Sequence, residues 1–202
     1  MKKEKFGMKL TMQLKQRSYD IILKAGCLKN LHQFTNTANR KVFVLTDSGV
    51  PAQYAQTVAD QCPDARVYTI PQGEGSKSLK VYGEVLQAML DFGMTRADLL
   101  VSVGGGVVGD LGGFCAASYM RGIDFVNCPT TVLSQVDSSI GGKTAIDLGE
   151  TKNIVGAFWQ PKVVLVDFDT LATLPRRQVV NGLAEALKTG LIGDPQLFAL
   201  FE

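Results

Sequence analysis

Histidine is nearly absent from this sequence, and the other residue types that build metal sites are scattered. His32 is the single histidine among 202 residues, which excludes any metal site or acid–base scheme that needs two histidines from this chain. The four cysteines, at positions 27, 62, 115 and 128, form no close pair. They therefore indicate neither a zinc knuckle nor a disulfide framework, and we expect reduced thiols in a cytoplasmic protein.

The chain also lacks an excess of charge and a long hydrophobic run. Its 21 Lys and Arg residues balance 19 Asp and Glu residues, so the formal net charge is only +2. A balance this close gives no basic field that would attract nucleic acid or an anionic membrane. The least polar stretch, residues 99–118, contains Asp110 and several glycines, a poor composition for a membrane-spanning helix. The charged start, MKKEK, precedes alternating rather than continuously apolar residues, so we expect no signal peptide.

What is present is typical of a folded α/β protein. Hydrophobic residues make up 46% and charged residues 20% of the chain, close to the average for soluble globular domains. Between Leu10 and Leu23, apolar residues alternate with polar ones, which predicts a half-buried antiparallel hairpin. Beyond residue 40, apolar strands alternate with helical segments, which predicts a mostly parallel, Rossmann-like sheet of six or so strands with helices on both faces.

The expected boundaries follow from this alternation. The predicted strands cover residues 42–45, 66–70, 99–103, 124–128 and 163–167, and the predicted helices cover residues 51–59, 78–92, 109–119 and 132–140. A further helix is expected to start at Pro175, since proline is favoured at the first helical position. We therefore expect an α/β domain over residues 1–174, and over residues 175–202 the start of a helical domain.

The strongest local motif is a glycine-rich turn between a strand and a helix. In LLVSVGGGVVGDLGGF, Gly104, Gly106 and Gly109 follow the expected strand at G-x-G-x-x-G spacing. Glycines there let the backbone approach a diphosphate, which the helix N-terminus attracts. A tight turn with close packing is the alternative. An ordinary Rossmann domain has this turn after its first strand, whereas here two βα units precede it, and Thr130 and Thr131 follow the next strand.

Two further segments gather polar residues. SQVDSSIGGKTAID, residues 134–147, fits either a closed site for a phosphorylated or polyhydroxylated ligand or a solvated turn. Lys143, Lys152 and Arg121 could form a cationic cluster for a phosphate, or be scattered surface charges. In the last helix, Asn181, Glu185 and Lys188 share one face, where Glu185 is either a metal ligand or base, or the partner of Lys188 in a surface ion pair.

Taken together, the motifs closely resemble the 3-dehydroquinate synthase family of sugar phosphate cyclases. The matching segments are GEGSK at 73–77, GGGVVGDLGGFCAASYMRG at 104–122, PTTVLSQVDSSIGGKTAID at 129–147, KNIVGAFWQP at 152–161 and LPRRQVVNGLAEALK at 174–188. The resemblance implies an NAD-holding α/β domain, a helical C-terminal domain and an active site between them. It also implies a homodimer and a lyase that converts 3-deoxy-D-arabino-heptulosonate 7-phosphate to 3-dehydroquinate and phosphate, with NAD used and regenerated and with a divalent metal, zinc or cobalt.

The resemblance assigns roles to individual residues. The expected NAD contacts are Asp47, Glu74, Lys77, Gly105, Gly106, Val107, Val108, Gly109, Asp110, Thr130, Thr131, Lys143, Lys152, Thr170, Leu171, Ala172 and Thr173. The expected substrate or active-site residues are Asp137, Lys143, Lys152, Asn153 and Lys188, with Arg121 reaching the neighbouring subunit's site. Glu185 is the one expected metal ligand, because the family's other two ligands are histidines of the C-terminal domain. We therefore expect this chain alone to be inactive.

Three other functions fit the same motifs. Another sugar phosphate cyclase, such as 2-deoxy-scyllo-inosose synthase, would share the NAD residues and differ in the substrate cleft. A metal-dependent glycerol or alcohol dehydrogenase would release NADH, whereas a cyclase shows no net redox change. A non-catalytic NAD-binding module would need no metal, which suits a chain with a single histidine.

Overall fold

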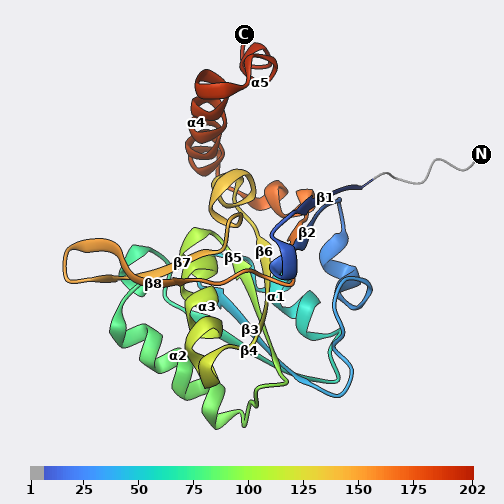
Figure 1. Cartoon of the computed structure of the whole chain (residues 1–202), viewed down its shortest axis with the longest axis vertical. Coiled ribbons are helices and arrows are strands. Elements are labelled where there is room, and N and C mark those ends of the chain that lie inside the picture. The colour runs from blue at the N-terminus through green and yellow to red at the C-terminus, as the bar shows by residue number, and fades with distance from the viewer. Residues whose placement is uncertain (1–6) are drawn as a thin grey trace, which may run out of the picture.

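A seven-stranded sheet runs through the centre of the structure (Figure 1). The computed structural model describes residues 7–202. The strand order is β1-β2-β9-β6-β5-β3-β4, and every neighbouring pair is parallel except β1 and β2. The strands are β1 Met8–Met12, β2 Tyr19–Leu23, β3 Lys41–Asp47, β4 Asp64–Ile70, β5 Leu99–Gly104, β6 Asp124–Pro129 and β9 Val163–Val166. This arrangement confirms the predicted mostly parallel sheet.

Helices cover both faces of the sheet, as the continuous apolar strands predict. Along β3, Val42 and Val44 face α1 (Ala52–Ala59) and the 3-10 segment Cys27–Gln33, while Phe43 and Leu45 face the opposite side. That second side is covered by α2 (Leu79–Asp91) and α3 (Gly106–Ser118). Because side chains alternate across a strand, a run that is apolar at every position is buried on both faces.

The N-terminal hairpin is confirmed, but its outer strand is more exposed than the alternation predicts. Met8 and Leu10 of β1 are 61% and 49% exposed, whereas Ile21, paired with Leu10, is 4% exposed. β1 ends at Met12 and does not reach Leu14. β1 forms one edge of the sheet, so it has a single neighbouring strand, whereas β2 lies between β1 and β9.

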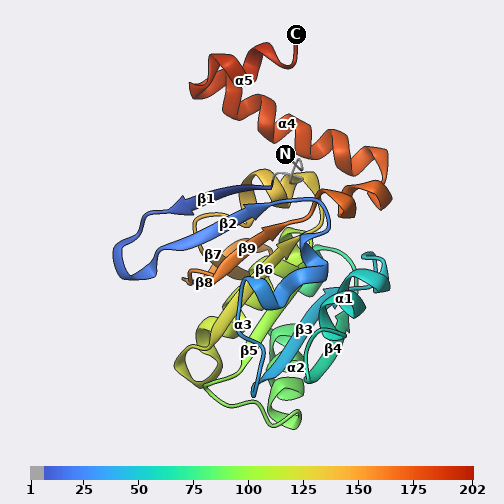
Figure 2. The ribbon, with the colours of Figure 1, turned by 90° about the vertical axis from the view of Figure 1, so that its right-hand side faces the viewer.

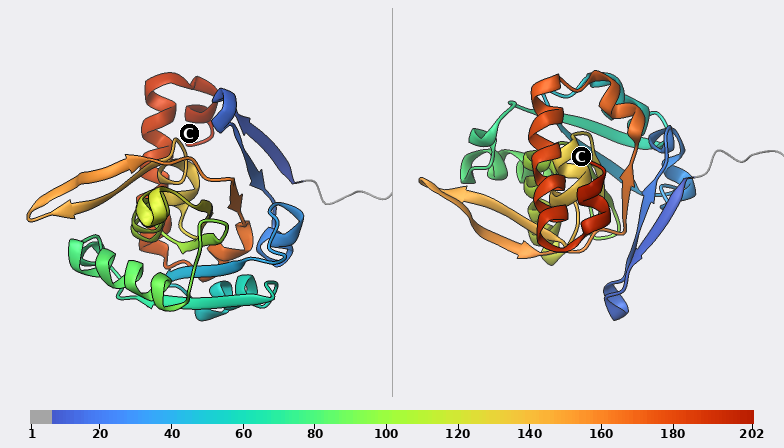
Figure 3. Two further views of the ribbon diagram at one scale, coloured as in Figure 1. Left: turned by 60° about the horizontal axis from the view of Figure 1, so that its bottom comes forward. Right: turned by 90° about the horizontal axis from the view of Figure 1, so that it is seen from above.

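A second hairpin was not predicted. β7 (Lys143–Leu148) and β8 (Thr151–Phe158) form a separate two-stranded antiparallel sheet that projects from the body of the domain (Figures 1 and 3). Thr144 and Ile146 of β7 are buried, and a Cβ on Gly113 of α3 would lie 2.4 Å from Thr144 Cγ2. The helix therefore carries glycine where the hairpin packs against it.

Several helix boundaries differ from the expected ones, and three of the differences lie near the predicted site. The helix predicted over 109–119 begins already at Gly106. The helix predicted over 132–140 spans 132–138, and its last turn, Ser134–Ser138, is a π-helix. Pro175 precedes α4 (Arg176–Gly193) as its N-cap rather than as its first residue.

The C-terminal helices stand apart from the sheet (Figure 2). α4 packs against the segment 132–138, where a Cβ on Gly182 would lie 2.5 Å from the Leu133 backbone nitrogen, and it continues into α5 (Pro195–Ala199). A domain boundary near residue 175 stays a prediction. Within residues 7–202, no helix has both the length and the apolar composition to cross a membrane. All four cysteines are free.

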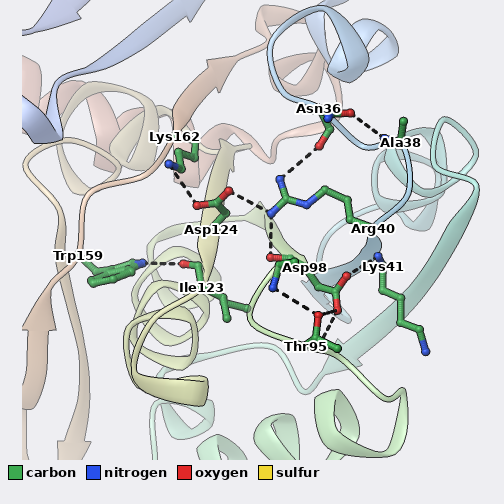
Figure 4. Close-up of polar contacts among 11 residues, drawn as sticks. Asn36, Ala38, Arg40, Lys41, Thr95, Asp98, Ile123, Asp124, Trp159 and Lys162 are labelled. Carbon is green, nitrogen blue, oxygen red and sulfur yellow. Dashed lines mark hydrogen bonds and ion pairs between the residues drawn. The ribbon is translucent and has the colours of Figure 1, made fainter.

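A polar cluster fastens the amino ends of the strands (Figure 4). Asp98 is 5% exposed and accepts hydrogen bonds from the Lys41 and Thr95 backbone N–H groups, at 2.7 and 2.5 Å, and from Thr95 Oγ1 at 2.9 Å. Arg40 donates to the Asp98 carbonyl oxygen at 2.9 Å and to Asp124 Oδ2 at 3.0 Å. Burial alone would raise the pKa of Asp98, but these N–H donors together with Arg40 hold it below its usual value.

Replacing Asp98 is expected to destabilise the fold in a pH-dependent way. Asp98→Ala leaves two partly buried backbone N–H groups, those of Lys41 and Thr95, without their acceptor. The change should lower the free energy of unfolding by about 2 kcal/mol at pH 7. Because the folded pKa is depressed, the stabilisation is present above the unfolded value of 3.8 and is lost as the pH falls through the folded pKa. Urea unfolding should therefore show that Asp98→Asn has a lower free energy of unfolding than wild type at pH 7, and that this difference becomes smaller below pH 3.8. A difference of the same size at both pH values would contradict a stabilising role for the ionised Asp98 carboxylate.

Candidate functional site

The N-terminus of α3 opens at the carboxyl ends of the parallel strands. Gly105 precedes the helix, and no side chain caps its first N–H groups, which are unpaired within a helix. A Cβ on Gly106 would lie 3.1 Å from Ser138 Oγ, and one on Gly105 would lie 3.3 Å from Thr131 Cγ2. Ser138 Oγ is buried and has no hydrogen-bond partner among residues 7–202. Free N–H groups, a spare hydroxyl and an approachable backbone suit a bound diphosphate.

The structure brings both predicted threonines to this turn. Thr130 is buried, and its N–H donates to the Gly104 carbonyl oxygen at 2.9 Å. Thr131 Oγ1 accepts from the Ser134 N–H at 3.2 Å and lies 2.8 Å from Ser134 Oγ. The Thr131 hydroxyl therefore caps the following helix, and its methyl group faces Gly105.

Asp47 ends the neighbouring strand β3 at the same edge. Its Oδ1 accepts from the Gly49 N–H at 2.7 Å, which shapes the turn after the strand. Burial raises the pKa of Asp47, and the N–H groups of Gly49 and Val50 oppose that shift. One oxygen of the Asp47 carboxylate therefore stabilises the turn that leads into α1.

A buried lysine joins several of the predicted residues. Lys77 is 4% exposed, and its Nζ lies 2.7 Å from Asp110 Oδ2 and donates to Asn153 Oδ1. Glu74 Oε1 lies 3.9 Å from Lys77 Nζ and 3.6 Å from Lys152 Nζ. Burial raises the pKa of Asp110 above its usual value, and the Lys77 ammonium offsets that shift only in part. One charged network therefore connects α3, the GEGSK turn and the β7–β8 hairpin.

A cavity of about 510 Å³ lies beside this network. Its polar lining includes Asp110, Asp137, Ser138, Lys143 and Asn153, and the hairpin adds the exposed apolar side chains Ile154 and Phe158. Carboxylates, an amide and an ammonium around one cavity suit a polyhydroxylated ligand with an anionic group.

The C-terminal helix does not form a metal centre with the rest of the described chain. Glu185 is paired with Lys188, and this carboxylate, with Asp137 contributing, raises the pKa of the lysine. Between residues 7 and 202, no group of three or more His, Cys, Asp or Glu side chains could hold a metal ion. The surface ion pair is thus what the structure shows at this position, and Asn181 is exposed on the same helix.

Arg121 lies apart from the cavity. It follows the C-terminal end of α3, opposite the glycine turn, and is exposed with a φ of +68°. It lies outside the cavity lining. The predicted cluster of Arg121 with Lys143 and Lys152 is therefore not formed within this chain.

The Thr170–Thr173 turn lies on the α1 side of the sheet edge. Thr170 Oγ1 donates to the Asp167 carbonyl oxygen at 2.7 Å, and Thr173 Oγ1 lies 2.8 Å from Tyr54 Oη of α1.

Gln135 is a site residue that was not predicted from the sequence. Its Nε2 donates to the Pro129 and Asp167 carbonyl oxygens at 3.1 and 3.3 Å. It thereby ties together the ends of β6 and β9, and no local sequence signal marks it for that task.

Comparison with known sequences identifies relatives of the chain. A sequence model described as 3-dehydroquinate synthase N-terminal matches residues 67–181. The 3-dehydroquinate synthase of Clostridium botulinum is 44% identical over 195 residues, which cover 94% of this chain and 56% of that protein. The 3-dehydroquinate synthase of Streptococcus thermophilus is 44% identical over 201 residues, covering 96% of this chain and 57% of that protein. The chain thus spans about half the length of the curated relatives it matches.

Solved structures confirm the fold class. A 2-deoxy-scyllo-inosose synthase complexed with carbaglucose-6-phosphate, NAD+ and Co2+ superposes with a TM-score of 0.85 at 27% identity, covering 92% of this chain and 52% of that one. A 2-epi-5-epi-valiolone synthase from Streptomyces hygroscopicus with NAD+ and Zn2+ bound has a TM-score of 0.82 at 32% identity, covering 94% and 54%. A glycerol dehydrogenase from Schizosaccharomyces pombe, at 21% identity and a TM-score of 0.65, shares the fold alone and covers 83% and 42%.

Proposed function

The chain belongs to the 3-dehydroquinate synthase N-terminal family, and we propose from this that it is the NAD-binding half of a 3-dehydroquinate synthase. The reaction proposed for the whole enzyme converts 3-deoxy-D-arabino-heptulosonate 7-phosphate to 3-dehydroquinate and phosphate. Curated relatives with that name are 44% identical to this chain. The 2-deoxy-scyllo-inosose synthase and the 2-epi-5-epi-valiolone synthase are 27% and 32% identical to it. This difference favours 3-dehydroquinate synthase over its neighbours.

The observation that carries the NAD proposal is the uncapped start of α3. Its glycines leave the backbone accessible, and the buried Ser138 hydroxyl beside Gly106 has no partner within residues 7–202. The residues that would hold NAD are the turn from Gly105 to Asp110, with Thr130 and Asp47 at the flanking strand ends and Lys77 fixing Asp110. Bound NAD would supply reversible hydride transfer, so the proposed reaction has no net redox change.

The substrate is proposed to occupy the cavity between α3 and the hairpin. Lys143 in the cavity lining would attract its phosphate, and Asp137 and Asn153 would hydrogen-bond its hydroxyls. Lys152 lies outside that lining, beside Glu74, and would add to the positive charge nearby. Their contribution is to bind and orient the substrate, which is a large part of what catalysis of such a reaction requires.

The described residues do not fit a divalent metal by themselves. Glu185 is a single carboxylate already paired with Lys188, and a catalytic zinc usually takes three protein ligands. The metal is therefore proposed only for the whole enzyme. For the whole enzyme we also propose a cytoplasmic location and a homodimer. In that dimer, the exposed Arg121 would face the neighbouring subunit.

Calorimetric titration with NAD tests the proposal. We expect wild type to bind NAD at one site per chain, and Lys77→Met to bind at least about tenfold more weakly because Asp110 loses its buried partner. Lys80→Met is the matched control, since Lys80 is 84% exposed on α2 and only 3.9 Å from Glu84 at the surface. A folded wild-type chain that shows no heat of binding at millimolar NAD would refute the proposed function.

A further inference from the structure

The β7–β8 hairpin contains one irregularity, and it lies beside the proposed site. Ile146 pairs with Val155 and Leu148 pairs with Thr151, so the single residue Asp147 of β7 lies opposite residues 152–154 of β8. At the centre of this bulge, Asn153 has a φ of +54°. A left-handed backbone is uncommon for residues other than glycine, although asparagine tolerates it better than most. Bulges of this kind re-aim a side chain.

Asp147 holds the bulge through two hydrogen bonds. Its Oδ1 accepts from the Asn153 backbone N–H at 2.8 Å, and its own N–H donates to the Lys77 carbonyl oxygen at 2.8 Å. The first bond gives an acceptor to an N–H that the bulge removes from the strand ladder. The second fastens the hairpin to the GEGSK turn.

The consequence appears at the side chains of Asn153 and Lys77. With its backbone held in this conformation, Asn153 turns its amide oxygen onto Lys77 Nζ, whose other close partner is Asp110 at 2.7 Å. The lysine is 4% exposed, and a buried ammonium needs acceptors for its N–H groups. The Asn153 amide therefore helps to fix the cation beside α3.

We infer that Asp147 is a positioning residue, which sets the β8 bulge so that Asn153 and Lys77 are aligned for NAD. The inference rests on the proposed function, since it takes Lys77 as part of the NAD site. Asp147 itself is not one of the residues that line the cavity. It acts through Asn153 and through the Lys77 backbone.

The test compares Asp147→Ala with Asp147→Asn, and with Glu150→Ala as a matched control at the exposed hairpin turn. The asparagine keeps an oxygen that can accept from the Asn153 N–H, whereas alanine keeps none. In Asp147→Ala we expect the Asn153 amide to lose protection from hydrogen exchange, as measured by NMR. We also expect NAD affinity, measured by calorimetry, to fall about threefold to tenfold, the size of one lost hydrogen bond. Asp147→Asn should retain most of both properties, and Glu150→Ala should match wild type.

Each other outcome overturns the inference. Wild-type NAD affinity in an Asp147→Ala chain whose Asn153 amide has become unprotected would show that the bulge does not position Lys77. If Asp147→Ala and Asp147→Asn lose NAD affinity equally, the negative charge of Asp147 matters and its hydrogen bond to the Asn153 N–H does not. A wild-type chain that fails to bind NAD refutes the proposed function and the inference together, whereas wild-type binding with an unaffected alanine variant refutes the inference alone.

Discussion

The 202-residue chain, incubated with 3-deoxy-D-arabino-heptulosonate 7-phosphate, NAD and zinc, is expected to release no phosphate. A chain that also carries the remaining length of its curated relatives is expected to release it. The difference should be all or none, because the described half lacks two requirements of the proposed reaction.

The first missing requirement is a metal centre. Within residues 7–202 no three suitable side chains come together, and Glu185 is held by Lys188. A lone carboxylate competes poorly with water for a divalent ion.

The second missing requirement is the exclusion of water from the cavity. Phe158 and Ile154 at the cavity are 73% and 60% exposed, so a phosphate there would meet Lys143 through screened charge.

Phosphate release should be followed alongside absorbance at the NADH band. For the extended chain we expect phosphate without accumulation of NADH, since the proposed reaction has no net redox change. Glu185→Gln in that chain should abolish release, while Glu84→Gln on the surface of α2 should not. Release from the short chain at a comparable rate would refute the prediction, and steady NADH formation would favour a dehydrogenase.

The main sheet could be predicted from the sequence because its strands are buried on both faces. Residues 42–45 and 99–103 are apolar at nearly every position, and helical segments separate the strands, so the strands and their parallel direction follow from the local pattern. The order of the strands in the sheet was not predicted. The exposure of β1 could not be predicted in this way. Leu10 alternates like a half-buried residue, but burial depends on what packs against the hairpin, and β1 lies at the sheet edge.

The β7–β8 hairpin shows why a polar segment can conceal strands. The polar residues of 134–147, Lys143 among them, indicated ligand chemistry rather than strands. The alternation of Thr144 and Ile146 is short and ends in an exposed leucine. The clearest signal was Gly149-Glu150, a two-residue turn with glycine first. That signal marks a hairpin only if the flanking residues are already assigned to strands.

The site was predicted as a set of residues and not as a network. The motif at residues 73–77 and Asn153 are far apart in the sequence, and only the tertiary fold shows that Lys77 and Asn153 share a hydrogen bond. The same is true of Asp147, whose contribution depends on a bulge that no periodicity marks. For Glu185, the structure shows the ion pair that the i, i+3 spacing with Lys188 allows.

Gly106→Val is expected to reduce NAD affinity by at least about a hundredfold, or about 2.7 kcal/mol. Gly106 is the first residue of α3 and has no left-handed φ, so valine fits its backbone. The new Cβ would lie 3.1 Å from Ser138 Oγ. This hydroxyl makes no hydrogen bond within the described part of the chain, so it can rotate or shift slightly without losing one. The γ carbons would then stand before the uncapped N–H groups that a diphosphate must approach. The fold should therefore survive while the anion site is closed.

A glycine elsewhere in the chain provides the matched control. Gly83 lies within α2 on the same face of the sheet, and a Cβ there would meet nothing within 4 Å. Gly83→Ala should raise the free energy of unfolding by about 1 kcal/mol, since alanine favours a helix, and should leave NAD affinity unchanged. Calorimetry with NAD and urea unfolding of both variants separate the two effects. If folded Gly106→Val binds NAD as wild type does, the diphosphate does not lie on the start of α3, and the cofactor must be sought at another part of the strand ends.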